Sequence, residues 1–408
     1  MNKENVTVVV LATGLTDRMN SKKSKLLMSI CGKPMAAYAI EAAQAVSASK
    51  PVMVVDEDAG ELQDLFADSV LYAEQNDALL PQVCLPGGGV TVVLSADMPL
   101  VDADMLNRLR QTSERKDVGA CVAMNEDETA QSASVYCFDT AILRKAIDTG
   151  AGTLSECVKY FADNGHGVEP IYSNDCDVAV DRIQLAQISE RLRTRINNNL
   201  MRAGVTLIDP QSTYIDAGVK IGTDTTVYPG VVIEGDCEIG QDVILYPGSR
   251  IVDSSIGDGS VVQNSVMMDA IVGENSTIGP YAYLRPNTVI GNGCRVGDFV
   301  EVKNAHIKDG AKVSHLTYVG DGEIGEKSNI GCGVVFVNYD GKKKSRTVVG
   351  RNAFVGCNVN LIAPVEVGDG AFVAAGTTVT HDVSKDALAI GRSKQKDIEG
   401  WAKKWWDK

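Results

Sequence analysis

The sequence predicts two domains of different class: an α/β domain with a Rossmann-like sheet, and a left-handed parallel β-helix built from hexapeptide repeats. In the segment 1–180, apolar strand-like stretches alternate with helix-like stretches. From about Thr206 to Val383, aliphatic residues instead recur every six positions. The chain also has 39 glycines and only 5% aromatic residues, which is typical of many tight turns rather than of a large aromatic core.

The first domain begins with the apolar run V-T-V-V-V-L-A-T-G (6–14), which ends in glycine and is typical of a buried parallel strand. Residues 34–46 then have the apolar spacing of a helix, with Pro34 at the start. Further strands are expected at 51–56, 69–75 and 90–99, and a further helix at 103–115. Strands that alternate with helices in this way predict a mostly parallel sheet.

A long helix is expected at 181–204, and the period of the sequence changes after Gly204. We therefore expect the chain to consist of four segments. They are the α/β domain at 1–180, the linking helix at 181–204, the β-helix at 205–384 and a C-terminal tail at 385–408.

The period of six indicates a solenoid, in which each repeat buries its aliphatic residue only by stacking on its neighbours. Glycine often follows the aliphatic residue and supplies turn dihedrals that β-branched residues cannot adopt. A sandwich of short strands would not keep one period over so many repeats. The recurring residues are Ile215, Ile221, Val227, Ile233, Ile239, Leu245 and Ile251, then Ile278, Leu284, Ile290, Val296, Val302, Val313, Val319, Ile324 and Ile330, and finally Val355, Leu361, Val367, Val373 and Val379.

One segment, F-V-N-Y-D-G-K-K-K-S-R-T-V-V-G (336–350), interrupts this period and contains four basic residues. Insertions in a solenoid form loops, and loops often carry function. In a chain with a formal net charge of −14, the basic cluster is either a solvated run of charge or a site for a phosphate group, as on coenzyme A or a sugar phosphate.

The acidic net charge argues against a nucleic-acid partner, because nucleic acids are bound by clustered Lys and Arg. No segment reaches about 18 consecutive apolar residues, so we expect no membrane span, and the first apolar run is too short for a signal peptide. The ten cysteines are scattered without a C-x-x-C pair. This pattern is typical of reduced thiols in a cytoplasmic protein.

Several motifs follow one another in the β-helix: R-P, V-E-V-K-N-A, H-L-T-Y, N-I-G, N-Y-D-G and A-A-G-T-T-V-T. In order and spacing they resemble the acetyltransferase domain of the bifunctional N-acetylglucosamine-1-phosphate uridyltransferase / glucosamine-1-phosphate acetyltransferase family. The resemblance covers the whole β-helix and the tail segment 387–401. It implies transfer of acetyl from acetyl-CoA to the amine of glucosamine-1-phosphate, for UDP-N-acetylglucosamine synthesis. It also implies a homotrimer whose sites draw residues from neighbouring chains.

The catalytic base implied by this resemblance is His315 of the H-L-T-Y motif. Acetyl transfer to an amine requires that the ammonium first lose a proton, and a neutral imidazole suits this task near pH 7. A single histidine is more often structural, but this one lies within a matching motif. His306, His166 and His381 have no matching role.

The resemblance also implies a set of substrate contacts. Arg285, Lys303 and Lys344 would bind the sugar 1-phosphate, because their positive charges suit a dianion. The remaining contacts with the amino sugar would come from Glu301, Tyr318, Asn329, Asn338 and Tyr339.

Acetyl-CoA would be bound by Cys332, Cys357, Ala375 and Arg392. Two of these residues depart from the family, which has Ala at the position of Cys332 and Ser at the position of Cys357. Cysteine is small and mostly apolar, so we expect the departure to affect the affinity for acetyl-CoA more than the activity.

The segment 8–35 resembles the nucleotidyltransferase domain of the same family, whose opening motif is L-A-A-G-x-G-T-R-M followed by a lysine. The matching positions imply that UTP would contact Gly14, Arg18, Lys25 and Gln75. Asp97, in S-A-D-M-P-L, would be a ligand of Mg²⁺.

Other parts of the nucleotide site are missing. The second glycine of the loop is Thr16 and its threonine is Asp17, so a side chain hinders the backbone and a carboxylate repels the triphosphate. The G-T-G-H-A motif expected after Gln75 is replaced by N-D-A-L-L, a G-Y-G-R segment is absent, and only Asp181 remains near the second metal position. We therefore expect a degenerate domain with weakened or lost uridyltransferase activity.

Three other functions remain open at this point. The chain could keep both activities with a rearranged nucleotide loop, or act on another amino sugar, since a fold does not fix a function. It could also be a non-catalytic scaffold that binds a sugar nucleotide. The H-L-T-Y and N-Y-D-G motifs argue against a scaffold, which has no need of a base.

Overall fold

The computed structural model describes residues 5–13, 17–56, 60–75, 79–85, 87–115, 117–125 and 134–406. The chain forms two compact units, Met1–Arg195 and Ile196–Lys408. The division falls within helix α6 (Arg182–Arg202), close to the linking helix that the sequence predicts at 181–204.

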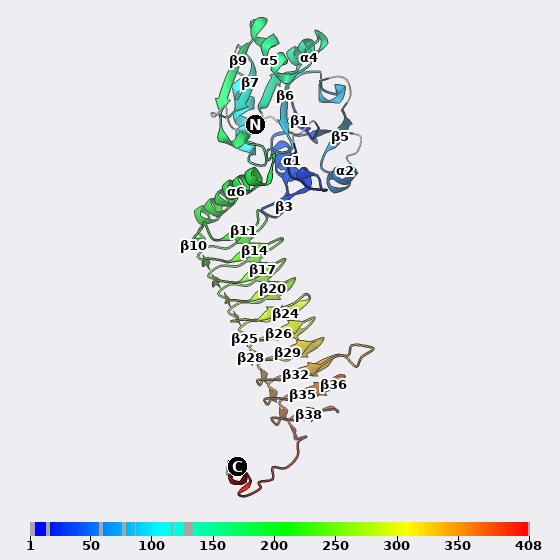
Figure 1. The fold of residues 1–408 in the computed structure, drawn as a ribbon, viewed down its shortest axis with the longest axis vertical. Helices are drawn as coiled ribbons and strands as arrows, with labels where there is room; N and C mark the ends of the chain where they lie inside the picture. Colours follow the sequence, from blue (N-terminus) through cyan, green and yellow to red (C-terminus); the bar gives the residue numbers. More distant parts are fainter. Residues whose placement is uncertain are drawn as a thin grey trace. The chain divides into compact units, whose positions relative to one another are not determined.

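The first unit contains, in its described residues, a seven-stranded sheet in the order β5-β4-β1-β6-β8-β7-β9 (Figure 1). Strands β5, β4, β1 and β6 run parallel, whereas β8 runs antiparallel to both β6 and β7. Since β7 and β9 also pair in parallel, β8 is the one antiparallel strand among the described strands of this sheet, and the prediction of a mostly parallel sheet is confirmed. The strands are β1 (Val6–Leu11), β4 (Val52–Val55), β5 (Leu71–Glu74), β6 (Val90–Ser95), β7 (Val118–Met124), β8 (Val135–Asp139) and β9 (Gly167–Tyr172).

Both faces of this sheet are covered. Val8 and Val10 of β1 pack in a cluster with α1 and α3, whereas Val9 between them packs in a second cluster with α4 and α5. Successive side chains of a strand point to opposite faces, so an all-apolar strand is what a sheet covered on both faces requires. The helices are α1 (Met35–Val46), α2 (Gly60–Phe66), α3 (Ala103–Ser113), α4 (Thr140–Asp148) and α5 (Leu154–Asp163), with short helices η1 (Lys25–Leu27), η2 (Gln82–Cys84) and η3 (Asn174–Cys176) and the hairpin β2 (Ser29–Ile30) and β3 (Lys33–Pro34).

The second unit is a parallel β-helix with three sides, each a parallel sheet along the described chain (Figure 1). The first side consists of β10 (Thr206–Leu207), β13 (Thr226–Val227), β16 (Ile244–Leu245), β19 (Val261–Val262), β22 (Thr277–Ile278), β25 (Arg295–Asp298), β28 (Lys312–His315), β31 (Asn329–Ile330), β34 (Phe354–Val355), β37 (Phe372–Val373) and β39 (Leu388–Ala389). The second side consists of β11 (Tyr214–Ile215), β14 (Val232–Glu234), β17 (Arg250–Val252), β20 (Val266–Met268), β23 (Tyr283–Leu284), β26 (Glu301–Lys303), β29 (Tyr318–Gly320), β32 (Val335–Val337), β35 (Asn360–Ile362) and β38 (Thr378–Val379). The third side consists of β12 (Lys220–Ile221), β15 (Glu238–Ile239), β18 (Ser255–Ile256), β21 (Ala270–Val272), β24 (Thr288–Ile290), β27 (His306–Ile307), β30 (Gly322–Ile324), β33 (Thr347–Val349) and β36 (Val365–Val367), and the tail ends in α7 (Trp401–Trp406).

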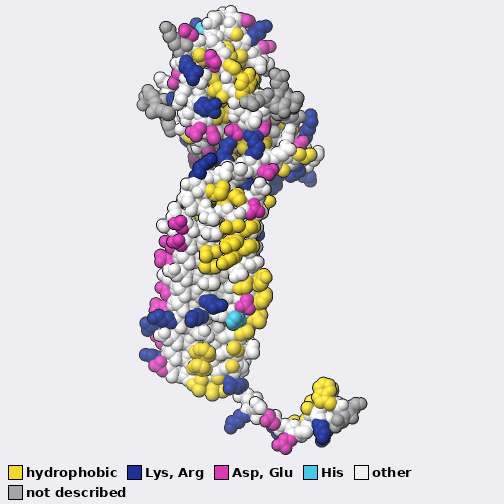
Figure 2. Space-filling model, turned by 90° about the vertical axis from the view of Figure 1, so that its left-hand side faces the viewer, with side chains coloured by type: hydrophobic (Ala, Val, Ile, Leu, Met, Phe, Trp, Pro, Cys, Tyr) yellow, Lys and Arg dark blue, Asp and Glu magenta, His cyan; other side chains and the backbone are white. Residues whose placement is uncertain are grey.

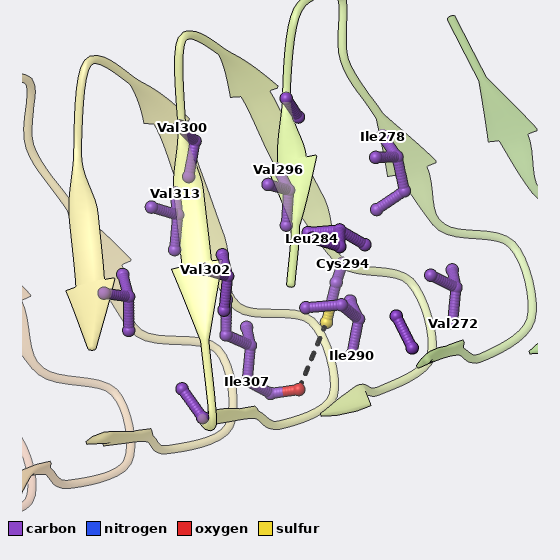
Figure 3. Close-up of a cluster of buried hydrophobic side chains, with 14 of the residues drawn as sticks. Val272, Ile278, Leu284, Ile290, Cys294, Val296, Val300, Val302, Ile307 and Val313 are labelled. Atoms are coloured by element: carbon purple, nitrogen blue, oxygen red, sulfur yellow. Dashed lines mark hydrogen bonds between the residues drawn. The ribbon is translucent and has the colours of Figure 1, made fainter. Parts of the chain in front are cut away.

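The recurring aliphatic residues fill the interior of the β-helix. Ile278, Val296 and Val313 are paired in register on the first side and point into the same interior as Ile290 and Ile307 of the third side (Figure 3). All the recurring residues that the sequence predicts as core are buried except Ile221, which is half-buried. The prediction of a hexapeptide β-helix is confirmed.

The basic segment at 336–350 lengthens one coil of the β-helix. Lys312 pairs with Asn329 in the next coil, and Asn329 pairs in turn with Phe354, so the second of these coils is the longer one. The extra residues lie between β32 and β33, and β33 then pairs with β30 and β36 as in the other coils. The insertion is therefore a loop at one corner that leaves the stacking of the coils intact.

In the described part of the chain, no helix has the length and apolar composition needed to cross a membrane.

Candidate functional site

His315 lies at the end of β28, beside Asp298 at the end of β25, one coil earlier. The His315 Nδ1 atom is 2.8 Å from the Asp298 Oδ1 atom. The hydrogen bond with His315 holds the pKa of Asp298 below its usual value, so this group is a carboxylate that can only accept. In the neutral form of the ring, Nδ1 therefore carries the proton and Nε2 is the acceptor. The pair has the chemistry of an oriented general base.

Asp298 was not among the residues that the sequence singled out. It precedes His315 by the same interval that separates Lys312 from Asn329, which is the length of one coil. The period of the β-helix could therefore have found it, because residues one coil apart lie directly above one another. The H-L-T-Y motif contains only residues that are adjacent in sequence, so a match to it does not indicate a residue one coil away.

Residues at the same place of successive coils form a column along the β-helix. The column that contains Asp298 and His315 continues through the residues expected to contact acetyl-CoA. The register of β28, β31, β34 and β37 places Cys332, Cys357 and Ala375 at successive coils after His315. The Cys332 carbonyl accepts a hydrogen bond from Asn358 N, and the Cys357 carbonyl accepts one from Gly376 N, both at 2.8 Å. Strands that pair in this way lie ~4.8 Å apart, so the column is a straight track along the β-helix.

The track ends at the last coils. Arg392 donates from Nη1 to the Ala375 carbonyl at 2.7 Å, so the guanidinium lies on the end of the column. An open pocket of about 320 Å³ lies next to it, lined by residues 377–384, 387 and 389–391. His381 is part of this lining, and its Nδ1 atom lies 3.0 Å from the Thr380 hydroxyl.

A second group of predicted residues lies on the second side of the β-helix and at its far corner. Glu301 and Tyr318 are paired in register, and Glu301 accepts from Arg285 Nη1 at 2.7 Å. Lys303 lies against Lys344 of the inserted loop; this contact and burial lower the pKa of Lys303, whereas the same contact raises the pKa of Lys344. Two neighbouring ammonium groups repel each other, so the arrangement favours a bound anion.

The Tyr318 and Asn338 side chains approach the backbone of Gly320 closely. A β-carbon at position 320 would lie 2.4 Å from the Tyr318 hydroxyl oxygen and 2.7 Å from the Asn338 amide nitrogen. A side chain at position 320 would therefore force Tyr318 and Asn338 to shift. Asn338 is buried, and its amide donates to the carboxylate of Asp321.

The other loop residues have local partners. Asp340 accepts hydrogen bonds from the backbone of Lys342 and Lys343, both at 2.8 Å, and Arg346 donates to Glu323 at 2.7 Å. The exposed Tyr339 donates its hydroxyl to the Gly341 carbonyl at 2.8 Å. Of the basic residues of the loop, Lys344 is therefore the one that the fold brings to Lys303.

Asn329 and His306 lie elsewhere on the β-helix. Asn329 pairs with Lys312 and Phe354 on the first side, before Cys332 in the same coil. His306 pairs with Val289 and Glu323 on the third side. The structure thus brings one group together around the second side of the β-helix and its far corner, Arg285, Glu301, Lys303, Tyr318, Asn338 and Lys344. A second group follows one column, His315, Cys332, Cys357, Ala375 and Arg392.

In the first unit, Lys25 and Asp97 form a buried ion pair. Their side chains are 3% and 4% exposed, and Lys25 Nζ lies 2.5 Å from Asp97 Oδ2. Asp97 Oδ1 accepts from the Ser95 hydroxyl, and Lys25 also donates to the Ala179 carbonyl at 3.3 Å. Both carboxylate oxygens of Asp97, the predicted Mg²⁺ ligand, thus bond to neighbouring side chains.

The other predicted nucleotide contacts are scattered or outside the described residues. Arg18 is exposed, with its backbone nitrogen bonded to the Val180 carbonyl, and Gln75 is exposed at the end of β5. Asp17 accepts from Met19 N at 2.8 Å, so its carboxylate closes a local turn. Gly14, Thr16 and most of the segment 76–82 lie outside the described residues or have no described side chain.

The described residues do not form a preformed Mg²⁺ site. Mg²⁺ prefers several oxygen ligands in near-octahedral geometry, but among the described residues no group of three or more His, Cys, Asp or Glu could hold a metal ion. Asp181 accepts from Ile183 N and Gln184 N, both at 2.9 Å, and so caps the start of α6. Since Asp97 is paired with Lys25, we derive no step through a metal ion here.

Comparison with known proteins supports both halves of this description. Residues 8–158 match the MobA-like NTP transferase domain, and residues 218–253, 269–304 and 346–381 match the bacterial transferase hexapeptide repeats. The chain is 38% identical to the bifunctional protein GlmU of Clostridioides difficile over 451 aligned residues, which cover 98% of each chain. It is 39% identical to GlmU of Caldanaerobacter subterraneus, with 98% of each chain covered, and 38% identical to GlmU of Listeria monocytogenes, with 97% of each chain covered.

The alignment with the C. difficile protein also shows that this chain lacks some residues. It extends over 451 positions, whereas the chain has 408 residues, so at least 43 positions (451 less 408) have no counterpart here.

We predict that Asp97→Ala destabilises the first unit by about 3–5 kcal/mol, because it removes the carboxylate that offsets the buried charge of Lys25. Urea unfolding followed by circular dichroism measures this change. The double variant Lys25→Met/Asp97→Leu should recover most of the loss, since an apolar pair removes both buried charges. Lys33→Ala is the control: its ion pair with Glu41 is exposed and contributes at most about 1 kcal/mol. Equal losses from Asp97→Ala and Lys33→Ala would contradict the prediction.

Proposed function

The chain belongs to the family of bifunctional GlmU proteins, and we propose that its β-helix transfers acetyl from acetyl-CoA to the amine of glucosamine-1-phosphate. The product is N-acetylglucosamine-1-phosphate, which supplies UDP-N-acetylglucosamine and cell-wall synthesis. The observation that carries the proposal is the His315–Asp298 pair, in which the imidazole is held with Nε2 as an acceptor. This pair begins the column that runs through Cys332 and Cys357.

In the proposed reaction His315 is the general base. Nε2 takes a proton from the ammonium group of the sugar, and the resulting amine attacks the thioester carbonyl. The tetrahedral intermediate collapses with cleavage of the C–S bond; the leaving sulfur takes the proton of the His315 imidazolium and departs as the coenzyme A thiol, and the second proton of the nitrogen passes to solvent as the amide forms. Asp298 stabilises the imidazolium that forms when Nε2 gains the proton, through the hydrogen bond at Nδ1.

The surface of the second side suits an amino-sugar phosphate. We assign the phosphate to Arg285, Lys303 and Lys344, because the repulsion between the two lysines is relieved by a dianion. Glu301 and Tyr318 lie in register between these cations and the corner that carries His315, where the sugar ring would lie. Asn338 would contact the amine, and Asn329 and Tyr339 are assigned to the sugar by family resemblance alone.

Acetyl-CoA is assigned to the column. Its pantetheine arm would follow Cys332, Cys357 and Ala375, which are one coil apart, and Arg392 would lie near a phosphate group. A straight track of backbone carbonyls and amides suits an extended chain that carries amide groups itself.

We also propose that the chain assembles as a homotrimer through the corner next to His315. Tyr281, Phe299 and Leu316 follow one another at this corner, each more than half exposed, and the Tyr281 and Phe299 rings stack at 5.5 Å. All three have positive φ, a conformation that is rare for bulky residues and is often kept for a function. Figure 2 shows hydrophobic side chains gathered in several patches over the coils of the β-helix.

For the first unit we propose a weakened or lost uridyltransferase activity. Lys25 and Asp97 neutralise each other in the described structure, and the Asp17 carboxylate lies in the loop after β1. Full bifunctionality is the second candidate, because the NTP transferase match covers 8–158 and the GlmU relatives align over 98% of the chain.

Incubating the protein with acetyl-CoA, glucosamine-1-phosphate and UTP tests these proposals together. We expect N-acetylglucosamine-1-phosphate to accumulate and UDP-N-acetylglucosamine to form far more slowly. Product identification by mass spectrometry separates the outcomes. Comparable rates of the two steps would establish full bifunctionality, and acetylation of a different amino sugar in preference would change the substrate.

The role of His315 is tested by replacing it. His315→Ala should lower kcat by about 10²–10⁴-fold, the usual contribution of a general base, with little change in KM for acetyl-CoA. His306→Ala is the matched control and should leave kcat unchanged, because His306 lies on the third side. Steady-state kinetics measures both. A kcat of His315→Ala near that of the wild type would end the assignment.

The role of the basic loop is tested at Lys344. Lys344→Ala should raise KM for the sugar phosphate by about 10- to 100-fold, because a charge-assisted hydrogen bond contributes about 1.5–3 kcal/mol. Lys342→Ala and Lys343→Ala should change KM little, since the fold brings only Lys344 of the three to Lys303. Equal, small effects from all three variants would mean that the loop is a solvated run of charge.

A further inference from the structure

Asp321 lies between two amide side chains at one corner of the β-helix. Asn304, Asp321 and Asn338 follow strands β26, β29 and β32, so each occupies the same place on successive coils. Asp321 Oδ1 accepts from Asn304 Nδ2 at 2.6 Å, and Asp321 Oδ2 accepts from Asn338 Nδ2. Its backbone nitrogen donates to the Lys303 carbonyl at 3.1 Å. Asp321 is thus held by backbone and side-chain bonds at once.

The protonation of Asp321 decides which way the Asn338 amide points. An ionised carboxylate has no proton to donate, so it can bond only to the NH₂ end of an amide. The Asn338 Nδ2 atom must therefore face Asp321, and Oδ1 must face the other way. This conclusion does not depend on how the two similar ends of the amide are assigned, because the reversed amide would place two acceptors against each other.

We propose that Asp321 is a positioning residue, which holds the Asn338 oxygen toward the amino group of the acceptor sugar. The inference rests on the proposed function and extends it. An amine donates its N–H to an oxygen, and an N–H fixed in this way directs the nitrogen lone pair toward the thioester. An Asn338 amide turned the other way would present N–H to N–H and exclude the amine.

The surroundings of Asp321 keep it ionised. Partial burial raises its pKa, but hydrogen bonds from Asn304 and Asn338 and the charges of Lys303 and Lys344 outweigh this, and the pKa lies below its usual value. The same two lysines belong to the proposed phosphate site. The neighbourhood that binds the substrate therefore also maintains the orientation of Asn338.

The experiment replaces Asp321 by asparagine in the full chain. Asn tolerates the positive φ of 48° at this position and has nearly the same size, so folding should be preserved. An asparagine can donate as well as accept, so the Asn338 amide is no longer fixed. We expect kcat for glucosamine-1-phosphate to fall by about 10- to 100-fold, the effect of one lost hydrogen bond to a charged group, with KM for acetyl-CoA unchanged.

Two further variants separate positioning from a general structural role. Asp321→Asn/Asn338→Asp exchanges the two side chains, so that the amide now at position 321 donates and the second oxygen at position 338 still accepts from the amine. This double variant should recover most of kcat, whereas Asn338→Asp alone, which places two carboxylates together, should not. Asp269→Asn is the matched control, since Asp269 also has positive φ and its nitrogen donates to a carbonyl of the preceding coil.

The possible results differ in which claim they overturn. An active wild type with an unchanged kcat in Asp321→Asn would overturn the inference and leave the proposed function standing. A loss of kcat in Asp321→Asn that Asp269→Asn reproduces would also overturn it, because the effect would then be structural. A wild type that acetylates no amino-sugar phosphate would overturn the proposed function itself, and the positioning role with it.

Discussion

Each coil of the β-helix is held to the next by parallel backbone hydrogen bonds, and each inward aliphatic side chain finds apolar neighbours only in adjacent coils. This stacking fixes the distance between equivalent residues at ~4.8 Å, the spacing of paired strands. The rest of the site depends on it. His315 meets Asp298 and Asn338 meets Asp321 because the members of each pair are one coil apart. For the same reason Cys357 follows Cys332 in the next coil. Two residues at the same place of adjacent coils therefore lie close enough to interact.

Two carboxylates use this geometry in the same way. Asp298 accepts from the imidazole of His315, and Asp321 accepts from the amide of Asn338. In both pairs a group that can only accept requires a donor opposite it, which fixes the tautomer of the His315 ring and the direction of the Asn338 amide. The ring and the amide are thereby oriented before any substrate binds, which lowers the entropy lost when the reacting groups meet. The inserted loop adds Lys344 to the same surface without disturbing the coils that hold these pairs.

In the first unit, the acidic residues near the predicted nucleotide site bond to groups that hold the fold. Its central polar residues, Lys25 and Asp97, satisfy each other at 2.5 Å within a nearly closed interior. Asp17 and Asp181 use their carboxylates to close a turn and to cap α6. Asp298 and Asp321 of the β-helix instead accept from the side chains of His315 and Asn338 and orient them.

The sequence by itself determined the β-helix, its core and the candidate base, because a period of six residues and the H-L-T-Y motif are local patterns. It also predicted β5, β4, β1 and β6 of the first sheet, but it did not assign β7, β8, β9, α4 and α5 in 118–172, although α4 buries Thr140, Leu143 and Ala146 at the spacing of a helix. Only the tertiary structure decided which charges meet. Asp298, Asp321 and the Lys25–Asp97 pair join residues 17 to 72 positions apart, and a sequence pattern does not record which acceptor lies beside which donor. Proton positions follow from such contacts, so the orientation of His315 and Asn338 could be derived only once the coils were stacked.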